Sequence, residues 1–171
     1  MKGKKIMTEN SKVVLRKLDT KYIDEYFEMI NSLEVHEMTE PNTLFKPFSY
    51  EEIKDWLDCL EGKDNRKDFA IVLEDIETFV GEVVLNEIKD KCCNLRIALL
   101  PIFFNKGYGT QAIKLAIQYA TNELNLERIE LDVYNINQRG IRVYKKCGFE
   151  EVSKIKISDD LYEIRMSLEK V

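Results

Sequence analysis

The feature that most constrains the fold is a helix-forming segment enclosed between two strand-forming segments in the second half of the chain. Residues 94–100 and 128–134 have the apolar alternation of strands. Between them, apolar residues recur at helical spacing from Gly109 to about Leu124. Two neighbouring strands of one sheet that are joined through a helix run parallel. We therefore expect one parallel pair of strands at this point.

The remaining segments predict an α+β fold with a mixed, mostly antiparallel and twisted sheet. Short polar turns separate strand-like runs at 69–73, 79–88 and 94–100, which indicates an antiparallel meander. We expect a single domain over residues 1–171, with residues 1–10 as a loose N-terminal extension. The other expected elements are a strand at 13–18, a helix at 23–30, a loop at 34–48, a helix opened by a capping box of Ser49 and Glu52, a helix at 138–146 ended by Gly148, and strands at 152–157 and 162–168.

The charge of the chain limits its classes of partner. It has 31 acidic and 26 basic residues among 171, a net charge of −5. Such a chain is poorly suited to nucleic-acid phosphates and well suited to a cationic substrate. The longest apolar run, Ile97–Phe104, is interrupted by Pro101 and is too short for a bilayer. We expect no nucleic acid and no membrane as partners, and no secretory signal in the polar N-terminus.

The four cysteines and the single histidine do not indicate a metal site. None of Cys59, Cys92, Cys93 and Cys147 forms a C-x-x-C pair, and His36 is remote from them in sequence. Adjacent cysteines are also poor disulfide candidates. We expect reduced thiols, a cytoplasmic location and no metal.

The segment NKGYGTQAIKLA has two glycines directly before the predicted helix. Backbone N–H groups at Gly107 and Gly109 can approach a phosphate closely, and the helix adds the positive end of its dipole. The P-loop pattern G-x-x-x-x-G-K-[ST] is absent. Gly107-x-Gly109-x-x-Ala112 does fit the dinucleotide fingerprint, with Asp132 about 20 residues further on. That alternative fits poorly, because a loop separates the glycines from the strand and antiparallel strands precede it.

Two separate stretches carry a family resemblance. Residues 96–113, RIALLPIFFNKGYGTQAI, contain a strand, a loop, the glycine turn and a helix. Residues 137–149, NQRGIRVYKKCGF, are similar to the element N-x-x-A-I-x-x-Y-x-K-x-G-F. Together they resemble the GNAT superfamily of acetyl-CoA-dependent N-acetyltransferases, most closely the RimJ/RimL-type ribosomal-protein N-terminal acetyltransferases and the polyamine acetyltransferases. The resemblance implies a splayed parallel pair and helices on both faces of the sheet.

The resemblance implies acetyl-CoA as cosubstrate and assigns residues to it. In the family, the pantetheine arm enters between the splayed strands and bonds to the strand backbone, here that of Ile97, Ala98 and Leu99. The N–H of Ile97 would polarise the acetyl carbonyl, and Asn137 would bond to the arm. Phe104 replaces the Gln or Arg that begins the family's glycine pattern, which removes one side-chain contact to phosphate. The turn expected to hold the diphosphate consists of Asn105, Lys106, Gly107, Tyr108, Gly109 and Thr110.

Catalysis is expected to need a proton donor and a proton acceptor. Tyr144 occupies the family position whose hydroxyl lies beside the thioester sulfur, and a phenol can donate to a departing thiolate. Many relatives carry a glutamate at the start of the splayed strand, and this chain does not. Glu82 and Glu87, on the preceding strand, are the candidates for the general base.

The lack of an evident base bears on the acceptor. At pH 7 an α-amino group costs about 1.2 kcal/mol to deprotonate, against about 4.6 kcal/mol for a lysine-like amine. We therefore expect direct attack, in a ternary complex, by the N-terminus of a protein or peptide. A polyamine or other small cationic amine is the alternative acceptor, and an acyl-CoA-binding sensor without turnover is the non-enzyme alternative. The oligomeric state is left open, a homodimer included.

Overall fold

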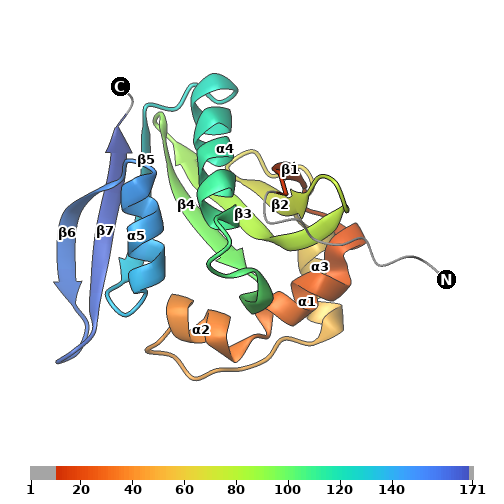
Figure 1. The fold of residues 1–171 in the computed structure, drawn as a ribbon, viewed down its shortest axis with the longest axis horizontal. Helices are drawn as coiled ribbons and strands as arrows, with labels where there is room; N and C mark the ends of the chain where they lie inside the picture. The colour runs from red at the N-terminus through yellow and green to blue at the C-terminus, as the bar shows by residue number, and fades with distance from the viewer. Residues whose placement is uncertain (1–10, 170–171) are drawn as a thin grey trace.

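The computed structural model describes residues 11–169, which form one mixed sheet with helices on both faces (Figure 1). Within this range the sheet has seven strands in the order β1-β2-β3-β4-β5-β7-β6. Neighbouring strands are antiparallel except β4 and β5, which are parallel, as predicted. The strands are β1 (Val13–Lys17), β2 (Lys67–Leu73), β3 (Thr78–Lys89), β4 (Cys92–Leu99), β5 (Arg128–Tyr134), β6 (Glu150–Lys156) and β7 (Tyr162–Glu169). The predicted extension at residues 1–10 lies outside the described residues.

The helices form a layer on each face. Gly109 of α4 lies close to the Leu99 side chain, so α4 covers that face of β4. Strand alternation places Ala98 on the other face, together with its cross-strand partner Glu82. Tyr26 of α1 contacts Glu82, so α1 belongs to this second layer. Among the described residues the α-helices are α1 (Ile23–Ile30), α2 (Leu33–Thr39), α3 (Tyr50–Asp58), α4 (Tyr108–Asn122) and α5 (Gln138–Lys146).

Capping signals in the sequence position two of these helices. Glu52 accepts the Ser49 backbone N–H at 2.7 Å, and the Ser49 hydroxyl accepts the Glu52 N–H at 3.2 Å. This confirms the predicted capping box at the start of α3. Gly148 follows α5 with a φ of +98°, a conformation that favours glycine and ends the helix as predicted.

The loop predicted over 34–48 is wrong in its first part, because α2 extends to Thr39. The Ser32 hydroxyl caps this helix by accepting the Val35 N–H at 3.4 Å, and Val35 is buried. Both prolines of the segment, Pro41 and Pro47, follow the helix and so do not interrupt it. Helix α2 lies near β5 and lines two cavities of the protein, so its position is relevant to function.

The parallel strands pair over only part of their length. Cys92–Asn94 of β4 pair with Arg128–Glu130 of β5. Beyond these residues β4 stays paired with β3 up to Leu99, while β5 stays paired with β7 up to Tyr134. Each strand thus keeps its outer neighbour, and the two strands part from each other. The predicted splayed pair is confirmed.

Small residues bring α4 close to the sheet beside this opening. Ala112, Ala116 and Ala120 recur at four-residue spacing on one face of the helix, and all three are fully buried. Their short side chains permit close contact with the strands beneath. The first turn of α4 lies beside the unpaired end of β4, where Gly109 is close to the side chains of Leu99 and Ile97 (Figure 1).

Candidate active site

The opening between β4 and β5 exposes backbone groups of β4. The Leu100 N–H donates to the Val80 carbonyl at 2.9 Å, which makes this a hydrogen-bonded pair. Hydrogen-bonded pairs alternate in an antiparallel ladder, so Ala98 also bonds to β3. The N–H groups of Ile97 and Leu99 must then point away from β3, toward β5. Beyond the last parallel pair, they face the opening.

The glycine turn leaves the start of α4 without a side-chain cap. Gly107 is the N-cap residue, with a φ of +79°, and has no side chain to accept a hydrogen bond. The first turn of α4 also contains no acidic residue. The N–H groups that begin the helix are therefore left for an external acceptor, and the helix dipole favours an anion there.

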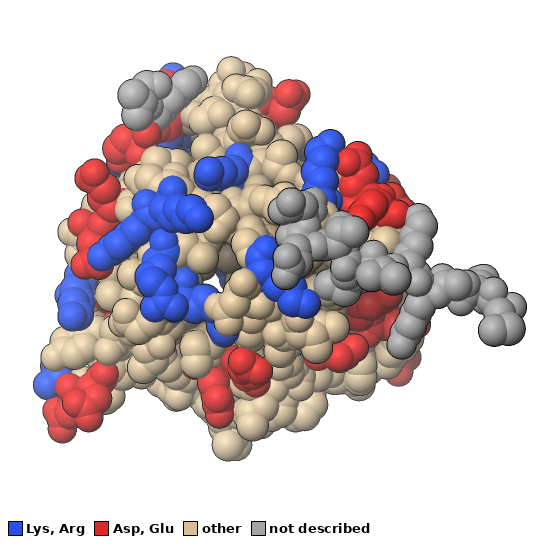
Figure 2. All heavy atoms as spheres, in the orientation of Figure 1, with Lys and Arg blue, Asp and Glu red and all other residues tan. Residues whose placement is uncertain are grey.

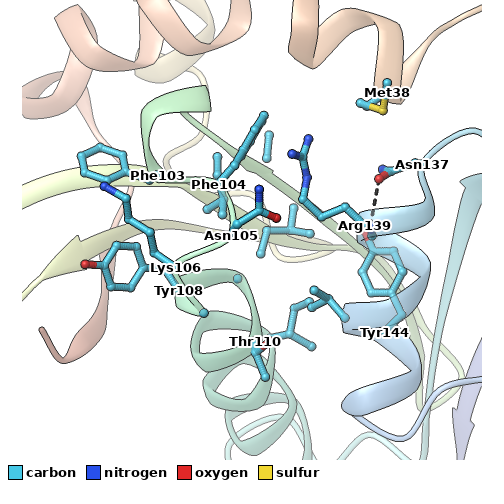
Figure 3. A pocket seen from close by; sticks show the side chains of 18 of the residues that line it. Met38, Phe103, Phe104, Asn105, Lys106, Tyr108, Thr110, Asn137, Arg139 and Tyr144 are labelled. Atoms are coloured by element: carbon cyan, nitrogen blue, oxygen red, sulfur yellow. Dashed lines mark hydrogen bonds between the residues drawn. The ribbon is translucent and has the colours of Figure 1, made fainter. Parts of the chain in front are cut away.

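A cavity of about 150 Å³ lies beside this turn, and we call it the turn cavity (Figure 3). It extends from the glycine turn to the backbone of β4 and the inner face of α5. All ten residues that the sequence assigned to the cosubstrate line it, together with the candidate acid Tyr144. The ten are Ile97, Ala98, Leu99, Asn105, Lys106, Gly107, Tyr108, Gly109, Thr110 and Asn137.

A second cavity of about 340 Å³, the outer cavity, adjoins the first. It lies among α2, the loop after it, and the parted ends of β4 and β5. The two cavities share seven lining residues, so a molecule bound in one cavity would lie next to a molecule bound in the other, beside β4. Three of the seven belong to α2 and were missed because that segment was predicted as a loop. The shared residues are Val35, Met38, Thr39, Ile97, Ala98, Asn137 and Tyr144.

Asn137 and Tyr144 project from α5 toward the turn cavity (Figure 3). The side-chain oxygen Oδ1 of Asn137 accepts the Gly140 N–H at 2.8 Å and so caps the helix. Only the amide NH₂ of Asn137 remains to donate to a bound molecule. Tyr144 is 7% exposed, and burial, followed by the nearby Cys147, raises its pKa to about 12. It is a neutral phenol at any physiological pH.

Glu82 and Glu87 have different surroundings. Glu82 lines the outer cavity opposite Ala98, while Glu87 is exposed and lines neither cavity. Burial raises the pKa of Glu82 to about 7; Arg96 opposes this shift and Asp68 adds to it. A carboxyl group with a pKa near 7 can accept a proton at neutral pH. Of the two candidate bases, only Glu82 is brought to the site.

Arg139 also lines the turn cavity, and sequence reasoning did not find it. Its guanidinium carbon lies 3.7 Å from the centre of the Phe104 ring. The only sequence signal would have been a cation in the first turn of a predicted helix, where the dipole disfavours it.

Residues 11–169 contain no group of three or more His, Cys, Asp or Glu side chains arranged to hold a metal ion. The same range has no helix with the length and apolar character needed to cross a bilayer.

The sequence matches a known domain over residues 12–150, described as "Acetyltransferase (GNAT) domain". The chain belongs to the GNAT acetyltransferase family. It is an acetyl-CoA-dependent N-acetyltransferase. The N-acetyltransferase YnaD of Bacillus subtilis is 27% identical over 128 residues, which cover 71% of this chain and 75% of that protein. The spermidine N(1)-acetyltransferase of Vibrio cholerae is 30% identical over 90 residues, which cover 52% of each chain.

Solved structures support the same fold. The crystal structure of spermidine N-acetyltransferase from Vibrio cholerae, in complex with CoA and spermine, superposes with a TM-score of 0.81 at 22% identity. The superposition covers 94% of this chain and 97% of that one. At this identity the likeness establishes the fold alone.

Tyr144→Phe tests the phenol directly. A neutral phenol can donate a hydrogen bond to the sulfur as negative charge develops, which contributes about 1.5–3 kcal/mol. We therefore expect kcat to fall about 10- to 100-fold. The affinity for acetyl-CoA should stay nearly unchanged, because the charge develops only during the reaction. Thiol release and calorimetry measure the two quantities.

The matched control is Tyr119→Phe. Tyr119 lies on α4, packs against Phe69, and lines neither cavity. Its variant should keep the wild-type kcat. A wild-type kcat for Tyr144→Phe would exclude a role for the phenol in thiolate departure.

Proposed function

We propose that the enzyme transfers the acetyl group of acetyl-CoA to a primary amine of a small cationic acceptor of the polyamine class. The observation that carries this proposal is the position of Glu82. It lies at the wall of the outer cavity, opposite Ala98, which lines both cavities. Its carboxyl group has a pKa of about 7. A base is therefore available where the acetyl group and the amine would meet.

In this proposal the turn cavity holds acetyl-CoA. The diphosphate lies at the N–H groups of the glycine turn, and the pantetheine arm follows β4 into the opening. The N–H groups of Ile97 and Leu99 face that opening and can bond to the arm and the acetyl carbonyl. Asn137 contributes its amide NH₂. The acetyl group then lies at the junction of the two cavities.

A cationic acceptor must lose two protons, and the leaving thiolate must be stabilised. The ammonium group first gives one proton to water, because only the neutral amine has the lone pair that attacks. The amine nitrogen attacks the acetyl carbon, and the Ile97 N–H stabilises the oxyanion. Glu82 accepts the proton that the nitrogen loses. The C–S bond then breaks, and CoA leaves as a thiolate that accepts a hydrogen bond from Tyr144. Full proton transfer from a phenol of pKa about 12 to a thiolate whose acid has a pKa of about 8.5 would be uphill, so Tyr144 acts as a hydrogen-bond donor.

The charges of the outer cavity favour a cation. Four carboxylates line it. Among the described residues, Glu82 and Glu40 accept side-chain hydrogen bonds only from the neutral hydroxyl groups of Tyr26 and Thr43. Asp132 accepts two hydrogen bonds from Arg165, at 2.9 and 3.1 Å, and Glu52 is held by the capping box. No ion pair within residues 11–169 involves Glu40 or Glu82. An acceptor with two ammonium groups could therefore place one at Glu82 and the other at Glu40.

A peptide N-terminus is the second candidate acceptor. The energetic argument for an α-amine rested on the lack of an evident base, and Glu82 removes that reason. One observation still favours a peptide. Leu44 and Phe48, at the rim of the outer cavity, are 92% and 51% exposed. A polyamine makes little use of such apolar side chains, whereas a peptide could cover them.

The pH dependence of kcat/KM, which reports the free enzyme, tests Glu82. Below pH 7 the carboxyl group carries a proton and cannot accept another, so kcat/KM should rise as the pH passes through about 7. Glu82→Gln should lower kcat about 100-fold and remove this limb. Glu87→Gln is the matched comparison and should leave both rate and profile unchanged. An unaltered profile in Glu82→Gln, or the loss appearing in Glu87→Gln, would reject Glu82 as the base.

A panel of acceptors tests the substrate class. We expect a higher kcat/KM for spermidine than for butylamine or for a peptide with a free N-terminus. Glu40→Gln should lower kcat/KM for spermidine about 2- to 5-fold, the value of an exposed ion pair, and leave butylamine unaffected. Glu37→Gln, on α2 but outside both cavities, is the control. A higher kcat/KM for the peptide would contradict the polyamine assignment and support the second candidate.

A further inference from the structure

An arginine side chain extends across the turn cavity and is stacked on an aromatic ring. Arg139 comes from the first turn of α5 and reaches toward Phe104 (Figure 3). Its guanidinium carbon is 3.7 Å from the ring centre, well within the range of a cation–π contact. Both side chains are half-buried. No carboxylate within residues 11–169 pairs with Arg139.

The stability of α5 does not explain this cation. A positive charge near a helix N-terminus opposes the helix dipole and is unfavourable there. The first turn of α5 has no acidic residue to offset it, whereas α1, α2 and α3 each have one or two. The position becomes favourable when an anion lies beside it.

Further positive groups surround the same cavity. Lys106 lies over the Phe103 ring at 5.6 Å, and the start of α4 contributes its uncapped N–H groups. Figure 2 shows Lys and Arg side chains gathered on both sides of a hollow on this face of the molecule. Positive groups thus line two opposite walls of the turn cavity. Lys106 and the N–H groups of the glycine turn form one wall, and Arg139 of α5 is on the other.

We propose that Arg139, held by Phe104, binds a phosphate group of acetyl-CoA. The inference rests on the proposed placement of acetyl-CoA in the turn cavity. Stacking occupies only the face of the guanidinium, so its N–H groups remain free along the edges. Such an edge can form two parallel hydrogen bonds to phosphate oxygens. The Phe104 side chain cannot form a hydrogen bond to the phosphate, and its role is to hold the guanidinium in position.

Substitution of Arg139 tests the contact. Arg139→Ala should raise the KM for acetyl-CoA about 10-fold, through the loss of a charge-assisted hydrogen bond. The KM for S-acetylpantetheine, which has no phosphate, should stay unchanged. Arg142→Ala is the matched control, since Arg142 lies on the same helix, is exposed, and lines neither cavity. An unchanged KM for acetyl-CoA, or an equal rise for both thioesters, would overturn the inference.

A rescue experiment tests the role of Phe104. Phe104→Ala should raise the KM for acetyl-CoA about 3-fold, because the guanidinium loses its support. Phe104→Arg combined with Arg139→Ala places a cation on the opposite wall and should restore most of the loss. An unchanged KM in Phe104→Ala would show that the ring does not hold the guanidinium. A double variant no better than Arg139→Ala would show that the loss is not one of positive charge in this cavity. 3′-Dephospho-acetyl-CoA identifies the phosphate: if the Arg139→Ala effect persists, it is the diphosphate, and if the effect vanishes, it is the 3′-phosphate.

Binding and folding are separated by thermal unfolding. Without ligand, Arg139→Ala should unfold near the wild-type temperature, while the rise that acetyl-CoA produces should be smaller. If the wild-type protein shows no rise with acetyl-CoA, the proposed placement of the cosubstrate fails. If the wild type and Arg139→Ala show the same rise, only the inference about Arg139 fails.

Discussion

The site depends on two parallel strands that share three residue pairs and then separate. β4 stays on the ladder of β3, and β5 stays on the ladder of β7. Closing the opening would require one strand to leave its outer neighbour, at the loss of several hydrogen bonds. The N–H groups of Ile97 and Leu99 therefore face a space that the protein itself does not fill. An extended ligand arm that contains amide groups can accept hydrogen bonds from them.

The two cavities differ in the charge of the groups that line them. The turn cavity is bordered by N–H groups, Lys106 and Arg139, and it suits the anionic end of acetyl-CoA. The outer cavity has more carboxylates than cations and suits an ammonium group. Tyr144 lines both cavities and Glu82 lines the outer one, opposite Ala98, and burial raises the pKa of each. At neutral pH the carboxyl group can accept a proton, while the phenol keeps its own.

The sequence predicts the parts of the site that local geometry dictates. A helix between two strands requires the parallel pair, and two glycines before a helix indicate the phosphate turn. The sequence could not place α2, because Ser32 is an ordinary cap and two prolines suggested a loop. Nor could it choose between Glu82 and Glu87. The two residues differ in their surroundings, because Glu82 contacts Tyr26 of α1 and lines the outer cavity, whereas Glu87 is exposed. The Arg139–Phe104 stack joins residues 35 positions apart and has no local pattern.

Amide hydrogen exchange resolved by NMR tests the central claim most directly. In the free enzyme the Ile97 and Leu99 amides should exchange fast, while Arg96 and Ala98, bonded to β3, exchange slowly. Saturation with acetyl-CoA should slow Ile97 and Leu99 strongly and change their neighbours much less. Slow exchange of Ile97 and Leu99 before any ligand is added, or no slowing on saturation, would contradict an open strand pair that receives the cosubstrate.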